Sequence, residues 1–319
     1  MIPHAVVLTA GLGTRLRPLT DVRAKPAIPV AGEPMIRRIV RTLVAQGVDD
    51  LVLNLHHLPA TLTASVGDGR DLGARVRYSW EPVILGSGGG PRLARPLVGS
   101  DTFWIVNGDT LTDLSLAPLA DAHAESGARV TLALVPNREF ARYGGVHLDD
   151  RRRVTRFTPR GPASEGSYHF IGVQLVDAGV FDAVRPGQAA SSIGGIYDAL
   201  IASQPDAVRG FVSDASFFDV GTIDDYRRTD DAFAATDPMR SSADTTPSVG
   251  RGTTIDPSAR VTRSILWDDV HVAAGARLDT CIVTDRVVVP QGAEYSRAVL
   301  VRGEDEYPIA TALSDDRSG

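Results

Sequence analysis

The chain has 319 residues, a formal net charge of −6 and 43% hydrophobic residues. No run approaches the roughly 18 apolar residues of a membrane span, and the acidic balance argues against general nucleic-acid binding. The single cysteine, Cys281, excludes an intramolecular disulfide and suits a reducing compartment. We therefore expect a cytoplasmic protein that binds neither membranes nor nucleic acid, with one large domain plus an addition, or two domains.

Residues 1–236 alternate predicted strands and helices. Apolar runs predict five buried strands, at residues 5–8, 51–55, 76–79, 103–106 and 130–135. A helix is predicted over 34–46, because apolar side chains recur at helical spacing between Pro34 and Gly47. This rhythm is typical of a Rossmann-like α/β fold, with a mixed, mainly parallel sheet covered by helices. Ligands bind such sheets at the carboxyl ends of the strands.

Beyond residue 144 the pattern becomes antiparallel. Three more strands are predicted, at 145–148, 154–157 and 170–176, and two further helices at 193–203 and 223–235. The whole segment 1–236 is expected to form one catalytic domain.

The remainder of the chain is repetitive. Residues 237–253 are rich in Ser, Thr, Pro, Asp and Gly and predict a linker. In 254–303, apolar positions recur at an offset of 17 residues, which predicts the stacked coils of a short parallel β-helix; a small irregular β-appendage is the alternative. An open end of such a stack favours pairing, so we expect a homo-oligomer built through the repeats. Residues 304–319 are expected to form a flexible tail.

A glycine-rich loop follows the first strand and reads Gly11-Leu12-Gly13-Thr14-Arg15-Leu16-Arg17-Pro18. Glycines there let backbone N–H groups approach phosphate oxygens, and the Arg15 guanidinium suits a triphosphate. The loop lacks the pattern of a P-loop and the third glycine of a dinucleotide fingerprint. Arg17 fits either a phosphate contact or an exposed position.

Three further charged residues suit nucleotide chemistry. Lys25 lies in a stiff segment next to Pro26, which would fix its charge, although an ordinary loop lysine also fits. Asp109 follows the predicted strand 103–106, and Asp219 stands in an apolar segment before a glycine. Either aspartate alone fits a turn or a helix cap. Together, beside a triphosphate loop, the two carboxylates predict a Mg²⁺ site.

In this order the motifs strongly resemble those of the sugar-1-phosphate nucleotidyltransferases. The resemblance rests on the loop 11–20 with Lys25-Pro26, and it continues through residues 85–90, 107–109, 143–146 and 218–222. The C-terminal repeats resemble the left-handed β-helix that some members carry. The resemblance implies a nucleotide-diphospho-sugar transferase fold. It also implies an enzyme that uses Mg²⁺, an NTP and a sugar 1-phosphate to make an NDP-sugar and pyrophosphate.

The resemblance also implies roles for individual residues. Triphosphate contacts are expected at Ala10, Gly11, Gly13, Thr14 and Arg15. Lys25 would contact the phosphates at the reacting centre, and Asp109 and Asp219 would hold Mg²⁺. Gly86 and Gly88 would lie against the nucleobase, and Gly145 would line the sugar pocket.

One departure from the family concerns the sugar. Where the family often has a glutamate and a lysine after the hairpin strand, this chain has Pro159 and Arg160. Arg160 can replace the lysine's charge on the sugar phosphate. Pro159 cannot replace the glutamate's acceptor for a sugar hydroxyl.

The nucleobase is predicted from Glu81, shortly before residues 86–90, a glycine run that is expected to form a loop. A carboxylate can accept two hydrogen bonds from the N1–H and N2–H₂ edge of guanine, which favours GTP. This segment also resembles that of guanylyltransferases, and the resemblance implies GTP with mannose 1-phosphate or a close relative. A solvated Glu81 before Pro82 is the alternative, in which case UTP or dTTP and another hexose 1-phosphate are equally compatible.

Two functions of other classes are compatible with parts of the sequence. A non-catalytic NDP-sugar sensor would share the fold, but the presence of Arg15, Lys25 and both aspartates favours catalysis. A second, acyltransferase activity in the repeats is disfavoured, because His271 is the only candidate catalytic histidine there.

Overall fold

A computed structural model describes residues 2–235, 247–304 and 307–313. The structure divides into two compact units, each built from separate stretches of the chain. The first unit comprises residues 1–11 and 36–218, and the second comprises 12–35 and 219–319. The chain therefore passes from one unit to the other inside the glycine-rich loop, and again just before Asp219. The predicted catalytic segment 1–236 contributes to both units.

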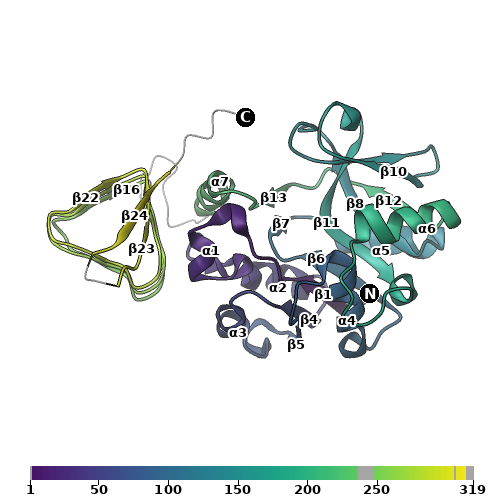
Figure 1. The fold of residues 1–319 in the computed structure, drawn as a ribbon, viewed down its shortest axis with the longest axis horizontal. Coiled ribbons are helices and arrows are strands. Elements are labelled where there is room, and N and C mark those ends of the chain that lie inside the picture. Colours follow the sequence, from purple (N-terminus) through teal and green to yellow (C-terminus); the bar gives the residue numbers. More distant parts are fainter. Residues whose placement is uncertain (1, 236–246, 305–306, 314–319) are drawn as a thin grey trace. The chain divides into compact units, whose positions relative to one another are not determined.

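The described residues of the first unit form a nine-stranded sheet. Its strands are β1 (His4–Leu8), β4 (Asp50–Leu55), β5 (Arg75–Trp80), β6 (Thr102–Asn107), β8 (Val130–Pro136), β9 (Gly145–Leu148), β10 (Val154–Thr158), β11 (Tyr168–Asp177) and β12 (Val208–Val212). The order is β10-β9-β11-β6-β1-β4-β5, with β8 joining β11 to β12 (Figure 1). β1 is parallel to β4 and β6, whereas β11 runs antiparallel to β6 and β8. The predicted mixed α/β sheet is confirmed.

Helices cover this sheet because its strands are apolar on both faces. Fully buried side chains include Val6, Val52 and Ile105 on one face of the sheet and Ala5, Leu51 and Trp104 on the other. The helices of the first unit, with short helical turns marked η, are α2 (Met35–Ala45), α3 (Pro59–Val66), η3 (Arg70–Leu72), α4 (Gly86–Val98), α5 (Leu116–Ser126), η4 (Pro162–Ser164), η5 (Ala178–Phe181), η6 (Ser192–Ile196) and α6 (Tyr197–Ser203). α4 packs on β1 and β4, and α5 packs on β8 and β11.

Residues 86–90 were expected in a loop, but they form the first turns of α4. Intrinsic propensity disfavours a helix there, since the segment has three consecutive glycines and α4 contains Pro91 and Pro96. Packing on the sheet decides the conformation instead, with Pro91 and Ala94 buried. The tertiary structure thus overrides the local preference.

The second unit begins with the glycine-rich loop. Its first elements are η1 (Thr14–Leu16), α1 (Leu19–Val22), η2 (Lys25–Ala27), β2 (Pro29–Val30) and β3 (Glu33–Pro34). In the first unit, β7 (Thr110–Thr112) forms a separate sheet with β13 (Phe217–Asp219), whose last residue already belongs to the second unit. The helix α7 (Ile223–Ala234) follows in the second unit. Thr222 caps α7 through a capping box with Asp225, which fixes where the helix begins.

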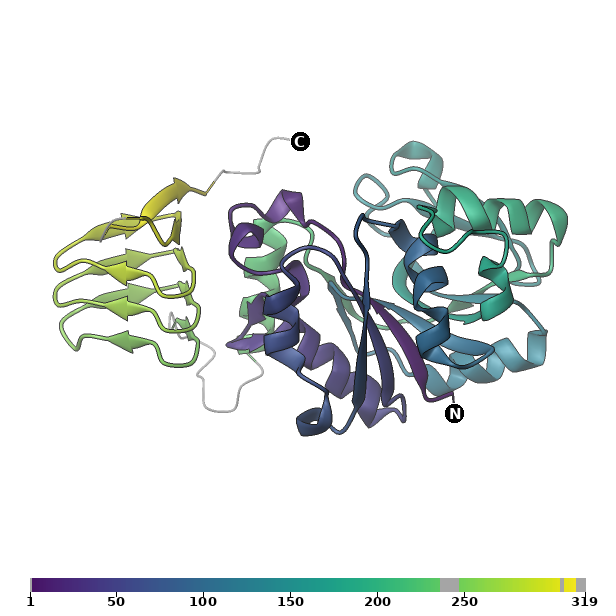
Figure 2. The ribbon, with the colours of Figure 1, turned by 60° about the horizontal axis from the view of Figure 1, so that its bottom comes forward.

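The repeats form the predicted parallel β-helix. Its three sheets contain, in order, β14 (Ser248–Val249), β17 (Ile265–Leu266), β20 (Ile282–Val283), β23 (Ala298–Val301) and β24 (Ile309–Ala312); β15 (Thr254–Ile255), β18 (His271–Val272) and β21 (Val288–Val289); and β16 (Arg260–Thr262), β19 (Arg277–Asp279) and β22 (Glu294–Ser296). Parallel partners lie 17 residues apart, as in Ser248, Ile265 and Ile282. The coil is triangular in Figure 1, and its turns are stacked in Figure 2.

Two boundaries of the β-helix differ from expectation. β14 lies within the predicted linker 237–253, of which residues 237–246 are outside the described residues. Residues 309–312 were assigned to a flexible tail, yet they form β24, which pairs antiparallel with β23. The strand reads Ile309-Ala310-Thr311-Ala312 and lies outside the 17-residue repeat, so the repeat pattern does not predict it, and all four of its residues are exposed. Among the described residues, no helix is long and apolar enough to cross a membrane.

Candidate active site

In the first unit, the ends of two adjacent parallel strands bring site residues together. Leu8 of β1 is in register with Asn107 of β6, and the Gly108 N–H donates to the Leu8 carbonyl at 2.9 Å. Ala10 and Gly11 therefore follow one strand, and the half-buried Asp109 follows its neighbour. This is the sheet edge at which ligands of such folds bind.

Asn107 has a partner that sequence reasoning missed. Gly172 in β11 has φ +79°, and a Cβ there would lie 2.7 Å from Asn107 Nδ2. β11 carries an irregularity between Phe170 and Gln174, where its register against β8 shifts. A glycine at this irregularity leaves room for Asn107, two residues before Asp109. A lone glycine inside an apolar strand was the available signal.

Glu81 is fully buried, and its carboxylate belongs to a polar network under the same strand ends. Its Oε1 accepts from Asn54 Nδ2 at 2.7 Å, and its Oε2 accepts from the Leu85 N–H at 2.9 Å. Asn54 Oδ1 in turn accepts from the Thr9 N–H at 2.6 Å. The network ties the ends of β1, β4 and β5 to the start of α4. Both Glu81 oxygens are thus engaged by the protein rather than turned toward a ligand.

The glycines at the start of α4 are packed against another backbone segment. A Cβ on Gly86 would lie 2.8 Å from the Ala190 carbonyl oxygen, and one on Gly89 would lie 2.4 Å from that of Gln188. The N–H groups of Gly88 and Gly89 donate to the Ala190 oxygen at 2.9 and 3.2 Å. Close packing therefore explains why these positions require glycine, in addition to the predicted nucleobase contact.

In the second unit, Gly13 and Lys25 lie against each other. Gly13 has φ +62°, and a Cβ there would come within 2.8 Å of Thr20 Cγ2 and 3.2 Å of Lys25 Cβ. Thr20 Oγ1 also donates to the Gly13 carbonyl at 3.0 Å. Only glycine combines this left-handed backbone with so little space. The buried Lys25 stem is therefore held directly beside the loop backbone, while Thr14 and Arg15 of the loop are exposed.

Arg15 lies over the turn that follows Asp219. A Cβ on Gly221 would lie 3.4 Å from both terminal nitrogens of Arg15. The Gly221 N–H donates to the Asp219 carbonyl at 3.0 Å, which closes the turn before α7. The second unit thus gathers Gly13, Arg15 and Lys25 with the turn carrying Asp219.

The β9–β10 hairpin of the first unit carries Gly145 and Arg160. Gly145 is buried, and a Cβ there would lie within 2.4–2.8 Å of the hydroxyls of Ser167, Thr158 and Ser164. Arg160 follows β10, is exposed, and makes no side-chain hydrogen bond or ion pair within the described part of the chain. Its charge is therefore available to a ligand.

Tyr143, two residues before Gly145, lines a cavity of about 350 Å³ together with His169 and Phe217. The Tyr143 and His169 rings stack with centroids 4.0 Å apart. Burial lowers the pKa of His169 to about 4, so its imidazole is neutral at physiological pH. Asn137 also lines the cavity, and its buried Oδ1 has no hydrogen-bond partner among the described residues.

The residues suit a magnesium ion that is completed by a substrate. No group of three or more His, Cys, Asp or Glu side chains that could hold a metal occurs within the described ranges. Mg²⁺ in nucleotide enzymes is commonly held by one or two carboxylates plus phosphate oxygens and water, so it needs no protein-only cluster. Asp109, which follows β6, and Asp219, the last residue of β13, are half-buried carboxylates, the type of ligand that such an ion takes.

Fold and site together define an α/β nucleotide-binding protein with an appended β-helix. The model of the nucleotidyl transferase family matches residues 4–235, and that of the GlmU-like C-terminal hexapeptide matches residues 230–305. The chain therefore belongs to the nucleotidyl transferase family.

Curated relatives of known activity cover most of the chain. It is 31% identical over 296 residues to the mannose-1-phosphate guanylyltransferase of Mycobacterium tuberculosis, covering 86% of this chain and 82% of the relative. It is 33% identical over 225 residues to the D-glycero-alpha-D-manno-heptose 1-phosphate guanylyltransferase of Aneurinibacillus thermoaerophilus, covering 70% and 96%. The crystal structure of HddC from Yersinia pseudotuberculosis matches 72% of this chain and 98% of its own, with a TM-score of 0.62 and 22% identity. That structural likeness supports the fold.

Proposed function

We propose that this protein is a sugar-1-phosphate nucleotidyltransferase that joins an NTP and a sugar 1-phosphate into an NDP-sugar and releases pyrophosphate. The observation that carries the proposal is the second unit's cluster of Gly13, Arg15 and Lys25 with the Asp219 turn. It places two cations beside a glycine-rich loop, which suits a bound triphosphate. The relatives named above are transferases of this kind.

The proposed reaction is a direct displacement at the α-phosphorus of the NTP. A phosphate oxygen of the sugar 1-phosphate forms the new P–O bond, the bond from the α-phosphorus to the α–β bridging oxygen breaks, and pyrophosphate leaves with that electron pair. Arg15 and the loop residues Ala10, Gly11, Gly13 and Thr14 bind the triphosphate, and Lys25 offsets charge on the reacting phosphates. Such transfers depend mainly on alignment and charge stabilisation, so no protein nucleophile is required.

We assign the Mg²⁺ ligands to Asp109 and Asp219. When bound, the ion would supply positive charge against the α-phosphate as negative charge develops there. The two carboxylates hold and orient the ion, and their own charge keeps it at the phosphates.

The sugar phosphate is assigned to the first unit. Arg160, which is exposed and has no side-chain partner among the residues that the structure describes, binds its phosphate group. The cavity lined by Tyr143, His169 and Phe217 receives the sugar, since its aromatic rings offer an apolar face to a pyranose. Gly145, which packs against the hydroxyls of Ser167, Thr158 and Ser164, remains a proposed neighbour of the sugar.

The proposed substrates are GTP and mannose 1-phosphate. Both relatives named above are guanylyltransferases, and one of them acts on mannose 1-phosphate. The predicted direct readout of guanine by Glu81 has less support, because both oxygens of its buried carboxylate are engaged by Asn54 and Leu85. Gly86 and Gly88 remain proposed neighbours of the base. UTP with another hexose 1-phosphate is the alternative, and a uridylyltransferase of Synechocystis shares 30% identity over 240 residues.

We further propose a cytoplasmic homo-oligomer. The single cysteine, Cys281, suits a reducing compartment. β24 ends one sheet of the β-helix with exposed residues, which leaves an edge available for pairing with a second copy.

A matrix of four NTPs and several sugar 1-phosphates, with pyrophosphate release as the readout, tests the proposal. We expect release that requires both substrates and Mg²⁺, with the highest kcat/KM for GTP and mannose 1-phosphate. A tenfold preference for UTP or dTTP, about 1.4 kcal/mol, would replace the substrates but leave the reaction class. Binding of an NDP-sugar without turnover for any pair would instead favour a non-catalytic sensor.

A further inference from the structure

The second unit joins the β-helix to residues that we assign to triphosphate binding. It contains residues 12–35, which carry Arg15 and Lys25, together with Asp219, α7 and all the coils of the repeat. The β-helix is therefore part of the same compact unit as half of the proposed site.

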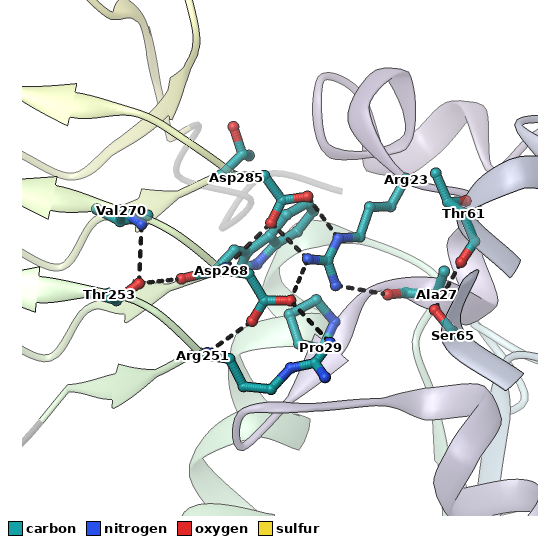
Figure 3. Close-up of polar contacts among 12 residues, drawn as sticks. Arg23, Ala27, Pro29, Thr61, Ser65, Arg251, Thr253, Asp268, Val270 and Asp285 are labelled. Atoms are coloured by element: carbon teal, nitrogen blue, oxygen red, sulfur yellow. Dashed lines mark hydrogen bonds and ion pairs between the residues drawn. The ribbon is translucent and has the colours of Figure 1, made fainter.

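Arg23 makes the main polar contact between the loop segment and the coils. Its Nε and one terminal nitrogen donate to the two oxygens of Asp285 at 2.6 Å each, and the same terminal nitrogen donates to Asp268 at 2.7 Å (Figure 3). The guanidinium also lies 5.4 Å from the centre of the Trp267 ring. Asp268 and Asp285 occupy equivalent positions in successive coils, 17 residues apart, so the repeat itself stacks the two carboxylates.

This ion group is largely buried. The side chain of Arg23 is 11% exposed, and those of Asp268 and Asp285 are 16% and 21% exposed. Burial alone would lower the pKa of Arg23, but the hydrogen bonds and charges of Asp285 and Asp268 outweigh it and raise the pKa. The guanidinium therefore stays charged, and removing it would leave two carboxylates close together without their cation.

Two further contacts hold the loop segment through α7. The buried Tyr226 hydroxyl donates to the Pro29 carbonyl at 2.7 Å and accepts from the Trp267 indole N–H at 2.9 Å. The buried Asp230 accepts from the Ala31 N–H at 2.6 Å and from the Ser248 hydroxyl. Hydrogen bonds thus connect the loop segment to the β-helix at three places, directly through Arg23 and by way of α7 through Tyr226 and Asp230.

The contacts surround the residues proposed to bind phosphate. Arg23 precedes Lys25 by two residues, and its other terminal nitrogen lies 3.4 Å from the carbonyl of Ala27, at the end of the turn η2 that begins at Lys25. Lys25 packs on Gly13, and Arg15 lies over Gly221 at the start of α7. A shift of this segment away from the coils would therefore displace both cations together.

We propose that the β-helix is a positioning element for the triphosphate-binding half of the active site, with Arg23 as its positioning residue. The proposal rests on the proposed function, because it concerns the same nucleotide site. It assigns the coils a role in nucleotide affinity as well as in the predicted assembly. The sugar-phosphate residues belong to the first unit, so loss of the Arg23 contacts acts on the NTP.

The test compares Arg23→Met and Arg23→Lys with Arg251→Met in the full chain. Arg251 is a matched control, because it also contacts Asp268, at 3.7 Å, but its side chain is 87% exposed and lies on the β-helix itself (Figure 3). We expect Arg23→Met to raise the KM for the NTP by tenfold or more and to change the KM for the sugar phosphate by less than threefold. Arg23→Lys should recover part of the loss, and Arg251→Met should behave as wild type.

Hydrogen exchange and calorimetric binding of Mg²⁺–GTP supply readouts that need no turnover. Arg23→Met should speed exchange of the amides in residues 12–35 and weaken GTP binding, while protection of the β-helix core persists. Should this variant fail to fold, Asp268→Asn, which keeps the Asp285 pair, carries the same comparison. Equal changes in both KM values, or unchanged exchange and GTP binding in Arg23→Met, would overturn the proposal. If the wild-type protein binds GTP but transfers its nucleotidyl group to no sugar phosphate, the proposed function alone would be overturned.

Discussion

At the scale of single residues, the proposed chemistry depends on two aspartates at strand ends. Asp109 follows β6, and Asp219 ends β13 before the turn covered by Arg15. We expect Asp109→Asn and Asp219→Asn each to lower kcat by about 10²-fold or more, because each removes charge that holds a cation against the phosphates. Steady-state rates across a Mg²⁺ titration measure this effect. Asp113→Asn is the control for Asp109→Asn, and near-normal Mg²⁺-dependent rates in either site variant would refute the metal assignment.

Arg160 provides the second prediction at this scale. Arg160→Ala should raise the KM for the sugar phosphate by about 10-fold or more, as expected for loss of a hydrogen bond between charged groups. The KM for the NTP should stay near that of wild type. Arg160→Lys should restore part of the affinity, since lysine keeps the charge but loses the planar fork. Arg156→Ala, at another exposed position of the same hairpin, is the control, and equal effects on both substrates would contradict the role.

His169 gives a prediction about pH. Its pKa of about 4 in the folded protein lies below the ordinary value of 6.5, so the unfolded chain binds a proton that the folded chain does not. The resulting stability is complete above about pH 7 and is lost as the pH falls from about 6.5 to 4, by up to about 3 kcal/mol. Denaturant unfolding of wild type and His169→Gln should show a flatter pH dependence in the variant. The same pH dependence of the unfolding free energy in wild type and His169→Gln would disprove this contribution of His169. His271→Gln is the control.

The polar network at Glu81 shows what a sequence can and cannot reveal about a residue. The position of this carboxylate before a glycine run indicates a candidate site residue from the sequence alone. Its partners, Asn54 and Thr9, come from other strand ends, so only the sheet order brings them together. The contact between Gly172 and Asn107 cannot be predicted from the sequence for the same reason. Arg23 was overlooked because nothing nearby in the sequence indicates Asp268 or Asp285.

At the scale of elements, strands and helices with clear periodicity were predictable and α4 was not. The strand β1 and the helix α2 have patterns that agree with their structure, whereas α4 starts with glycines that favour a loop. The 17-residue repeat predicted the β-helix in register because each coil must stack its apolar residues on the next. β24 lies outside this repeat and pairs antiparallel with β23, so the repeat does not predict it.

α4 also supports a prediction about packing. Gly89→Ala should destabilise the first unit by about 1–3 kcal/mol, because the new Cβ would lie 2.4 Å from the Gln188 carbonyl oxygen and one of the two backbones must move. Chemical denaturation of the purified variant measures the loss. Gly195→Ala is the control, since the nearest atom to a Cβ there lies 3.8 Å away. Equal stability of the two variants would show that the contact between α4 and residues 188–190 is not tight.

At the scale of the whole molecule, the two compact units do not follow the order of the sequence. Residues 12–35 belong to the same unit as α7 and the β-helix. The boundary between the two units therefore falls within the glycine-rich loop, between Gly11 and Leu12. The order of the sequence predicts a catalytic segment followed by a separate repeat segment. The contacts of Arg23 with Asp268 and Asp285 join residues far apart in the sequence and are not predictable from it. The repeats are therefore proposed to contribute to nucleotide binding as well as to assembly.

The transfer itself is tested most directly by ³¹P NMR of the intact protein with GTP, mannose 1-phosphate and Mg²⁺. We predict that the resonances of both substrates decline together, while those of a sugar-linked diphosphate and of pyrophosphate grow in equal amounts. Asp109→Asn should show the same products at a rate lower by about 10²-fold or more. Formation of orthophosphate, or of pyrophosphate without a sugar-linked diphosphate, would show hydrolysis instead. That result, or unchanged spectra with every NTP and sugar 1-phosphate pair, would contradict the proposed nucleotidyl transfer.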